Sequence, residues 1–147
     1  KTAYEIMPSL VGSEMCIRDR LKMIMLLEKH IDIKGKRIAV LGLSFKKGTD
    51  DIRESRSIAV IRELIRKGAH VSAYDPLAME NMKKIFHNIE YCLTAEDAIK
   101  NADACVIMTD WDEFSSLDFK IMKKPIVIDG RRVVKKREGM IYEGICW

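Results

Sequence analysis

The residues whose types and spacing suggest chemistry lie close together in the sequence, in the stretch 42–55. Within it, Lys46, Lys47 and Arg53 stand just before the expected start of a helix. Cations and unpaired backbone amides at a helix start suit an anionic ligand. The first chemistry that the sequence indicates is therefore anion binding by this stretch.

The stretch matches neither of the two common phosphate-binding loops. Ser44 stands where a GxGxxG dinucleotide loop has its second glycine. It is not a P-loop either, because five residues rather than four separate Gly42 from Gly48, and Thr49 replaces the lysine. The residues alone leave two alternatives open: an anion-binding loop, or a solvated loop in which an acidic residue or Ser55 caps the helix.

Composition excludes several other kinds of site. Lys and Arg number 26 against 22 Asp and Glu, and aromatic residues make up 7%. This mild, interleaved charge does not indicate nucleic-acid binding. The four cysteines form no C-x-x-C pair and there are only three histidines, so no metal site is expected. No apolar run approaches the roughly 18–20 residues of a membrane span, and no secretory signal is recognisable, which favours a cytoplasmic protein.

From residue 21 onward, apolar residues alternate between strand-like runs and amphipathic helical spacing. Strands are expected over 37–43, 69–74, 89–92, 104–108, 125–129 and 139–146. Helices are expected over 21–30, 55–66, 77–86 and 94–101, with a short helix or turn over 114–121. This alternation with short connections predicts an α/β protein: a Rossmann-like, three-layer α/β/α fold with a mainly parallel sheet of about five to six strands.

In such sheets, ligands bind beyond the carboxyl ends of the strands. The loops expected there are 42–46, 74–76, 109–111 and 129–131. Asp75 ends the second strand, where dinucleotide folds place an acid for the ribose. Because no glycine fingerprint precedes it, we interpret Asp75 as a turn residue before Pro76. Trp111 either shields the cleft or packs locally, and the sequence does not decide between these.

The stretch 42–55, Gly-Leu-Ser-Phe-Lys-Lys-Gly-Thr-Asp-Asp-Ile-Arg-Glu-Ser, resembles the signature that opens the C-terminal domain of the UDP-glucose/GDP-mannose dehydrogenase family. The resemblance continues through Tyr-Asp-Pro at 74–76, Met-Thr-Asp-Trp-Asp-Glu-Phe at 108–114 and Asp-Gly-Arg-Arg-Val at 129–133. The tail at 142–145 is also similar, so the likeness covers about 33–147.

The resemblance implies an enzyme that oxidises the C6 alcohol of a nucleotide sugar to a carboxylate in two NAD-dependent steps. An N-terminal domain would bind NAD, and a central region would supply the catalytic cysteine and homodimer contacts. The C-terminal domain would close over a UDP-sugar substrate. No segment of this chain matches the catalytic-cysteine motif or GxGxxG. We therefore expect no catalytic residue here and an incomplete enzyme that is inactive alone.

The resemblance also implies roles for individual residues. Phe45 and Lys46 match a substrate-contacting Phe-Lys, and Arg131 matches a substrate-contacting arginine. Arg53 matches an arginine that reaches NAD across the domain cleft. We expect Lys46 and Arg131 at adjacent strand ends, facing one cleft, with a cation each for the same ligand. A GDP-mannose or other nucleotide-sugar dehydrogenase domain, or a non-catalytic nucleotide-sugar-binding module, remains an alternative.

The beginning of the chain differs in pattern from the rest. Residues 14–19, Glu-Met-Cys-Ile-Arg-Asp, match one reading frame of a transposon adaptor used in DNA library preparation. We expect residues 1–20 to be adaptor-derived or otherwise non-native. Residues 21–33 are expected to form the end of a connecting helix, and 34–147 the nucleotide-sugar-binding C-terminal domain.

Overall fold

A computed structural model of the chain describes residues 22–44, 48–52, 55–134 and 139–144. The segment 1–20 and the expected site residues Phe45, Lys46 and Arg53 lie outside these residues. Six strands form one sheet: β1 (Arg37–Leu41), β2 (His70–Tyr74), β3 (Glu90–Tyr91), β4 (Ala104–Ile107), β5 (Ile126–Asp129) and β6 (Ile141–Gly144). Their spatial order is β3-β2-β1-β4-β5-β6, and every described pairing is parallel. The predicted α/β fold with a parallel sheet is confirmed.

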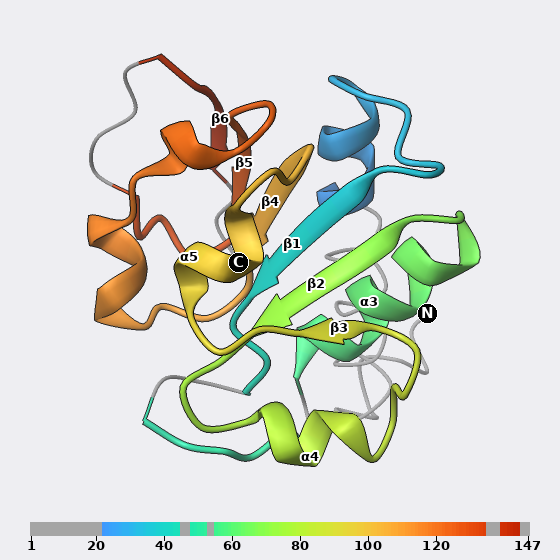
Figure 1. The fold of residues 1–147 in the computed structure, drawn as a ribbon, viewed down its shortest axis with the longest axis vertical. Helices are drawn as coiled ribbons and strands as arrows, with labels where there is room; N and C mark the ends of the chain where they lie inside the picture. Colours follow the sequence, from blue (N-terminus) through green and yellow to red (C-terminus); the bar gives the residue numbers. More distant parts are fainter. Residues whose placement is uncertain (1–21, 45–47, 53–54, 135–138, 145–147) are drawn as a thin grey trace, which may run out of the picture.

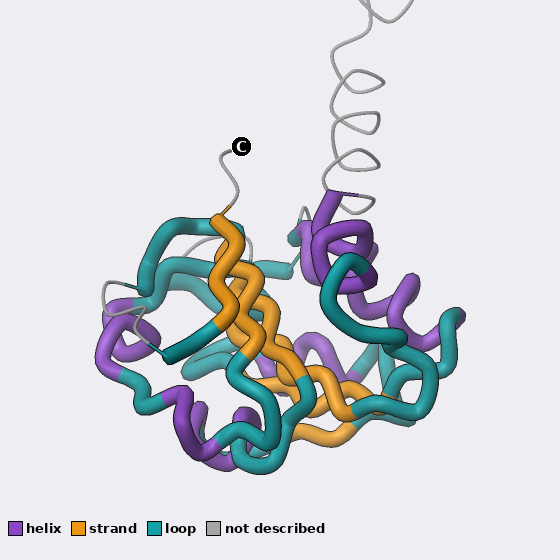
Figure 2. The backbone as a smooth tube through the Cα atoms, turned by 90° about the horizontal axis from the view of Figure 1, so that it is seen from above, coloured by secondary structure: helices purple, strands orange, loops and turns teal. Residues whose placement is uncertain are grey.

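Helices cover both faces of this sheet, which forms the twisted central layer in Figure 2. The α-helices are α3 (Arg56–Arg66), α4 (Met79–Lys83) and α5 (Ala95–Ile99). Two 3₁₀ helices, η1 (Asp112–Ser116) and η2 (Phe119–Ile121), follow β4, and residues 22–28 form a further helix. No helix among the described residues is long and apolar enough to cross a membrane.

The alternation of side chains along β1 explains why both faces need cover. Ile38 and Val40 are fully buried in an apolar cluster with residues of α3, α4 and the helix at 22–28. Ala39 and Leu41 are fully buried in a second cluster with α5 and both 3₁₀ helices. A strand buried on both faces reads as a continuous apolar run, which is the pattern used to predict it.

Two predicted helix starts are confirmed by their capping side chains. Ser55 accepts a hydrogen bond from the Ser57 backbone amide at 3.2 Å, and Thr94 accepts one from the Asp97 amide at 3.0 Å. The helix expected over 77–86 is shorter than predicted and spans Met79–Lys83. Its beginning is displaced because the amides at 77 and 78 bind the Asp75 carboxylate in a turn, each at 2.8 Å.

Candidate functional site

The four predicted loops follow β1, β2, β4 and β5, at the edge of the sheet toward which the strand arrows point in Figure 1. The direction in which successive strands are added to the sheet reverses between β1 and β4. From β1, β2 and β3 are added on one side, and β4, β5 and β6 are then added on the other. In open parallel sheets this switch point is where ligands bind. The candidate site is therefore built on the loops that follow β1 and β4.

The loops after β1 and β4 approach each other closely at Gly42. Gly42 has φ +96°, and a Cβ placed on it would lie 2.5 Å from the Thr109 side chain and 2.6 Å from its backbone nitrogen. Thr109 in turn donates a hydrogen bond from Oγ1 to the Ser44 carbonyl at 3.0 Å. Both the positive φ and the close approach require glycine at this position.

The stretch that follows β1 is fixed at several points along its length. The Leu43 and Ser44 amides donate to Asp75 Oδ2, at 2.8 and 3.2 Å. Ser57 Oγ, in the first turn of α3, donates to the Gly42 carbonyl at 3.1 Å. Asn81 Nδ2 of α4 donates to the Asp50 carbonyl at 2.8 Å. These contacts hold the described residues on both sides of positions 45–47 and 53–54.

Asp75 does more than the turn role predicted from the sequence. Its Oδ1 accepts the two amides that begin the turn into α4, as a turn residue would. Its Oδ2 also accepts from Ser44 Oγ at 3.2 Å and from Trp111 Nε1 at 3.1 Å. Trp111 belongs to an apolar cluster beneath α5, so it packs locally. Sequence reasoning missed this link, which joins the loops after β1, β2 and β4.

Arg131 stands in a loop that Asp129 shapes. The buried Asp129 carboxylate accepts from the Arg131 amide at 3.0 Å, the Val134 amide at 2.8 Å and the Tyr142 hydroxyl at 2.9 Å. Arg132 then has φ +56° and completes the turn. Asp129 thus fixes the backbone of Arg131, another positioning role that sequence reasoning did not assign.

The Arg131 guanidinium remains available for a ligand. Its described ion pair is with Asp110, in the loop after β4, at an N–O distance of 3.9 Å. The Arg131 and Asp110 side chains are 29% and 35% exposed. A pair this long and this exposed contributes little stability. A ligand phosphate could therefore replace Asp110 as the partner of Arg131 at small cost.

The structure corrects the expectation that Lys46 and Arg131 come from adjacent strands. Lys46 follows β1 and Arg131 follows β5, and β4 lies between these strands. Two strand spacings correspond to about 10 Å. The sequence showed that all the loops share one edge, but not the order of the strands along it. Because positions 45, 46 and 53 lie outside the described residues, their assigned roles stay predictions.

Neither described cysteine has the properties of a nucleophile. Burial, with a smaller contribution from nearby Glu90, raises the pKa of Cys92 to about 11. Cys105 is fully buried, and desolvation raises its pKa further still. Thiols act as nucleophiles when their pKa is lowered in an electropositive, partly exposed setting. Neither Cys92 nor Cys105 is therefore set up as a thiolate nucleophile.

A cavity of about 340 Å³ lies at the opposite, amino-terminal edge of the sheet, where Arg37, His70 and Glu90 line it. Arg37 and Glu90 begin β1 and β3 and bind each other across it, at 2.6 Å between Nη1 and Oε1. Arg37 and Glu90 thus pair with each other, although the buried Arg37 Nε has no hydrogen-bond partner among the described residues. Ligands of parallel sheets bind at the other edge. We place the candidate site at the carboxyl edge.

The strand order and the loops at the switch point define a doubly wound, Rossmann-like α/β protein. The chain belongs to the UDP-glucose/GDP-mannose dehydrogenase family: residues 39–136 match its UDP binding domain. A UDP-glucose 6-dehydrogenase of Haloferax volcanii is 54% identical over 126 residues, covering 84% of this chain and 29% of the relative. The enzyme of that name from Rickettsia bellii is 46% identical over 73% of this chain and 26% of its own length.

Solved structures show the same relationship. A UDP-glucose dehydrogenase from Pyrobaculum islandicum superposes with a TM-score of 0.79 at 36% identity, covering 91% of this chain and 30% of that one. A GDP-mannose dehydrogenase from Pseudomonas aeruginosa gives a TM-score of 0.74 at 26% identity, over 95% of this chain and 34% of that one. The chain spans less than a third of the length of the Haloferax and Pyrobaculum proteins.

Proposed function

We propose that this chain is the substrate-binding, C-terminal part of a UDP-glucose 6-dehydrogenase, the enzyme that oxidises UDP-glucose to UDP-glucuronate with NAD. The observation that carries the proposal concerns Arg131. Asp129 fixes the Arg131 backbone at the carboxyl edge, and the described ion pair of the Arg131 side chain, with Asp110, is long at 3.9 Å. Relatives named UDP-glucose 6-dehydrogenase support the choice of ligand. The boundaries proposed are a connecting helix end at 21–33 and the binding domain at 34–147.

The proposed ligand is an extended dianion, which suits cations that are spread along the edge. Arg131 would bind one part of the diphosphate–sugar unit, and Lys46, from the loop after β1, another part about 10 Å away. Phe45 would pack against the ligand. A charge-assisted hydrogen bond between a fixed cation and a phosphate oxygen is about twice as strong as a hydrogen bond between neutral groups.

The described residues do not fit a NAD site of their own. The loop after β1 lacks the glycine fingerprint, and both oxygens of Asp75, at the ribose-acid position, are already hydrogen-bonded within the chain. NAD, which accepts hydride in this reaction, would bind mainly to another part of the intact enzyme. In that enzyme, a homodimer or larger homo-oligomer, Arg53 would reach NAD across the cleft.

Calorimetric titration of the purified chain with UDP tests the ligand assignment. We expect Arg131→Ala and Lys46→Ala each to weaken UDP binding by about ten- to a hundred-fold, since a lost charged hydrogen bond is worth about 1.5–3 kcal/mol. Arg66→Ala, at the far end of α3, is the matched control and should bind UDP normally. Tighter binding of GDP than of UDP would favour the GDP-mannose alternative.

A chimera tests the enzymatic part of the proposal. This chain would replace the matching part of the Haloferax volcanii relative, and UDP-glucose and NAD would be varied separately. Lys46→Ala and Arg131→Ala should raise KM for UDP-glucose, and Arg53→Ala should raise KM for NAD. The chain alone should produce no NADH. A chimera that binds UDP-glucose but never reduces NAD would instead support a non-catalytic binding module.

A further inference from the structure

The Asp75 carboxylate is the most heavily hydrogen-bonded side chain at the candidate site. It is fully buried. Its oxygens accept from described groups in three different loops: the Leu43 and Ser44 amides and Ser44 Oγ after β1, the Leu77 and Ala78 amides after β2, and Trp111 Nε1 after β4. All six of these described donors are neutral dipoles.

The Leu43 and Ser44 amides lie where a doubly wound fold normally binds a ligand phosphate. Backbone amides that follow the first strand of a doubly wound fold are the usual donors to a ligand phosphate. Here the same amides point at an anion of the protein itself, at 2.8 and 3.2 Å. The end of β2, where a dinucleotide fold presents an acid to a ribose, supplies that anion.

Trp111 extends the arrangement across the switch point. Its indole donates to the same Asp75 oxygen that the Leu43 and Ser44 amides bind. Trp111 is the immediate neighbour of Asp110, which pairs with Arg131. Residue 44 directly precedes the predicted contacts at 45 and 46. One carboxylate therefore fixes the backbone beside both groups of predicted ligand contacts.

We propose that Asp75 is a positioning residue: an internal anion that takes the place of a ligand phosphate on the amides after β1 and fastens that loop to Trp111. Two consequences follow. A ligand phosphate is excluded from these amides. The backbone at 43 and 44, beside the predicted ligand contacts at 45 and 46, is also held in place before the ligand arrives. The second consequence rests on the proposed function; the first does not.

Anion rescue tests whether Asp75 acts as a bound anion. Asp75→Ala leaves the amides facing a carboxylate-sized space, and formate should occupy it. We expect sodium formate to raise the Tm of Asp75→Ala by several degrees relative to sodium chloride at equal ionic strength, and to leave wild type unchanged. Ser72→Ala, which loses a buried hydrogen bond to the Ala98 carbonyl, is the control and should not respond.

The result that overturns the internal-anion assignment is equal behaviour of Asp75→Ala in formate and chloride. If Asp75→Ala folds only in formate, the assignment is supported; if it folds in neither salt, rescue has failed and the assignment is contradicted. Inorganic phosphate serves as a second probe, because it should bind Asp75→Ala more tightly than wild type once the amides are vacated.

Trp111→Phe tests the fastening of the loop while keeping the buried carboxylate. We expect amide hydrogen exchange at residues 43 and 44 to quicken about ten-fold and UDP binding to weaken about three- to ten-fold. Tyr91→Phe is the matched control: it also deletes one aromatic donor, which binds the Phe86 carbonyl at 2.7 Å rather than Asp75. Its exchange at 43 and 44 and its UDP affinity should match wild type.

The outcomes separate this inference from the proposed function. If wild type binds no UDP, the proposed ligand is wrong, and formate rescue and amide exchange still decide the role of Asp75. If wild type binds UDP and Trp111→Phe changes neither exchange nor affinity, the fastening role is wrong and the proposed ligand stands.

Discussion

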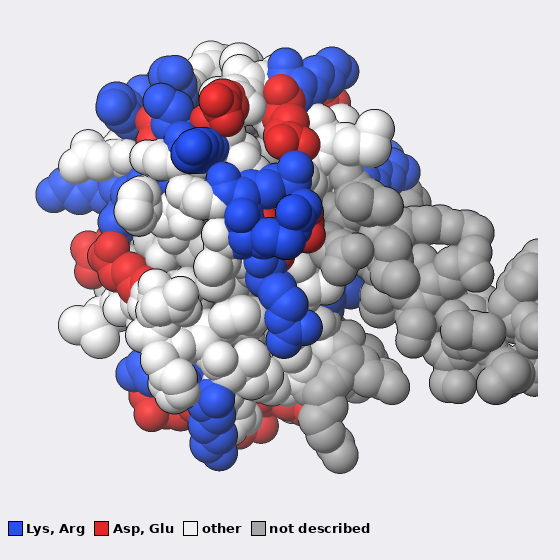
Figure 3. All heavy atoms as spheres, turned by 90° about the vertical axis from the view of Figure 1, so that its right-hand side faces the viewer, with Lys and Arg blue, Asp and Glu red and all other residues white. Residues whose placement is uncertain are grey.

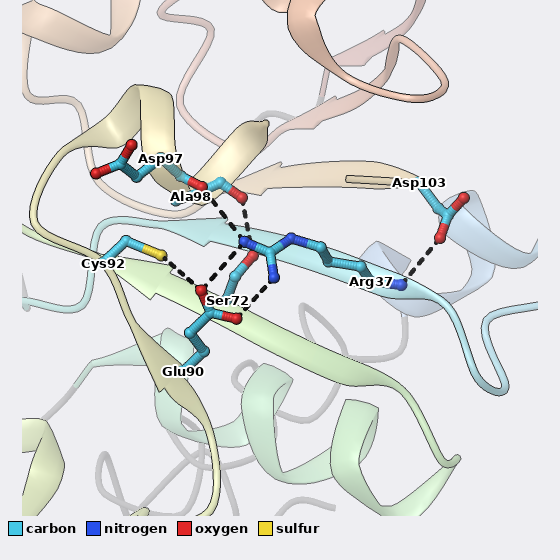
Figure 4. Close-up of polar contacts among 7 residues, drawn as sticks. All are labelled: Arg37, Ser72, Glu90, Cys92, Asp97, Ala98 and Asp103. Atoms are coloured by element: carbon cyan, nitrogen blue, oxygen red, sulfur yellow. Dashed lines mark hydrogen bonds and ion pairs between the residues drawn. The ribbon is translucent and has the colours of Figure 1, made fainter. Parts of the chain in front are cut away.

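The two edges of the sheet differ in what binds their charged side chains: an ion pair at the amino edge, and neutral hydrogen-bond donors to buried carboxylates at the carboxyl edge. At the amino edge, the Arg37 guanidinium binds Glu90 with two hydrogen bonds, at 2.6 and 3.4 Å, and a third reaches the Asp97 carbonyl at 3.3 Å (Figure 4). Cys92 Sγ completes the group, 3.6 Å from Glu90. At the carboxyl edge, Asp75 and Asp129 are buried and bind backbone amides, hydroxyls and an indole.

This difference affects which cations can serve a ligand. The hydrogen bond with Glu90 raises the pKa of Arg37, and the same bond lowers the pKa of Glu90. That cation is committed to a structural pair. On the described part of the face drawn in Figure 3, Lys and Arg lie among Asp and Glu. The buried acids of the carboxyl edge use neutral donors among the described residues, and the described pair of Arg131, with Asp110, is a long one at 3.9 Å.

The largest expected difference between the two edges is in the unfolding free energy lost when a glycine at each edge is replaced by alanine. Gly42→Ala combines a positive φ with a clash against Thr109, and should cost about 2–5 kcal/mol of unfolding free energy. Gly35, at the amino edge, also has positive φ (+75°) but no atom within 4 Å of an added Cβ. Gly35→Ala should cost only about 1–2 kcal/mol, the conformational part alone. Urea denaturation measures both, and equal losses would show that the close approach at Gly42 is unimportant.

The second effect compares the carboxylates themselves. Asp129→Asn replaces one carboxylate oxygen by an NH₂ group, which cannot accept hydrogen bonds from the donors that bind Asp129. It should lower the unfolding free energy by about 2–3 kcal/mol. The same chemical change at the exposed pair, Glu90→Gln, should cost less than about 1 kcal/mol. Chemical denaturation of both variants at neutral pH checks this. A loss at Glu90→Gln as large as that at Asp129→Asn would contradict the distinction between the edges.

A smaller effect concerns Asp110, the partner of Arg131. Removing its negative charge beside the proposed diphosphate should tighten UDP binding by about two- to five-fold, since charge repulsion near a protein surface is worth about 1 kcal/mol or less. The gain should shrink as salt is added. Glu80→Gln, an exposed acid on α4, is the control for net charge. Weaker UDP binding by Asp110→Asn would show instead that Asp110 orients Arg131.

Local signals in the sequence predicted most elements of the fold. Apolar runs marked the strands, Ser55 and Thr94 marked two helix starts, and glycines marked the loops at the carboxyl edge. The strand order could not be read, because connection lengths do not state which neighbour a strand joins. The placement of β4 between β1 and β5 is therefore what overturned the expected adjacency of Lys46 and Arg131.

The role of Asp75 was hidden for a related reason. Asp-Pro after a strand is typical of a turn, and that part of the prediction was right. The donors that make it a positioning residue come from 32 and 36 positions away, at Leu43 and Trp111. These groups come together only when three loops have folded, so no local sequence pattern predicts the contact. The same holds for Tyr142 and Asp129, which are 13 positions apart.

The smallest expected effect is a pH dependence confined to the amino edge. The pKa of Glu90 is lowered in the folded protein, chiefly by its hydrogen bond with Arg37. A lowered carboxyl pKa contributes stability that is complete above the unfolded pKa, about 4.3, and is lost as pH falls through the folded pKa. Glu90→Gln should therefore be slightly less stable than wild type at pH 7, and the difference should disappear only once the pH has fallen below the lowered folded pKa of Glu90. The Glu90 side chain is 56% exposed, so the difference is well under about 1 kcal/mol.

A double-mutant cycle with Arg37→Met, measured by urea denaturation across this pH range, isolates the pair from other acids that titrate there. A coupling energy that stays constant down to pH 3 would mean that Arg37 does not act on Glu90 through charge.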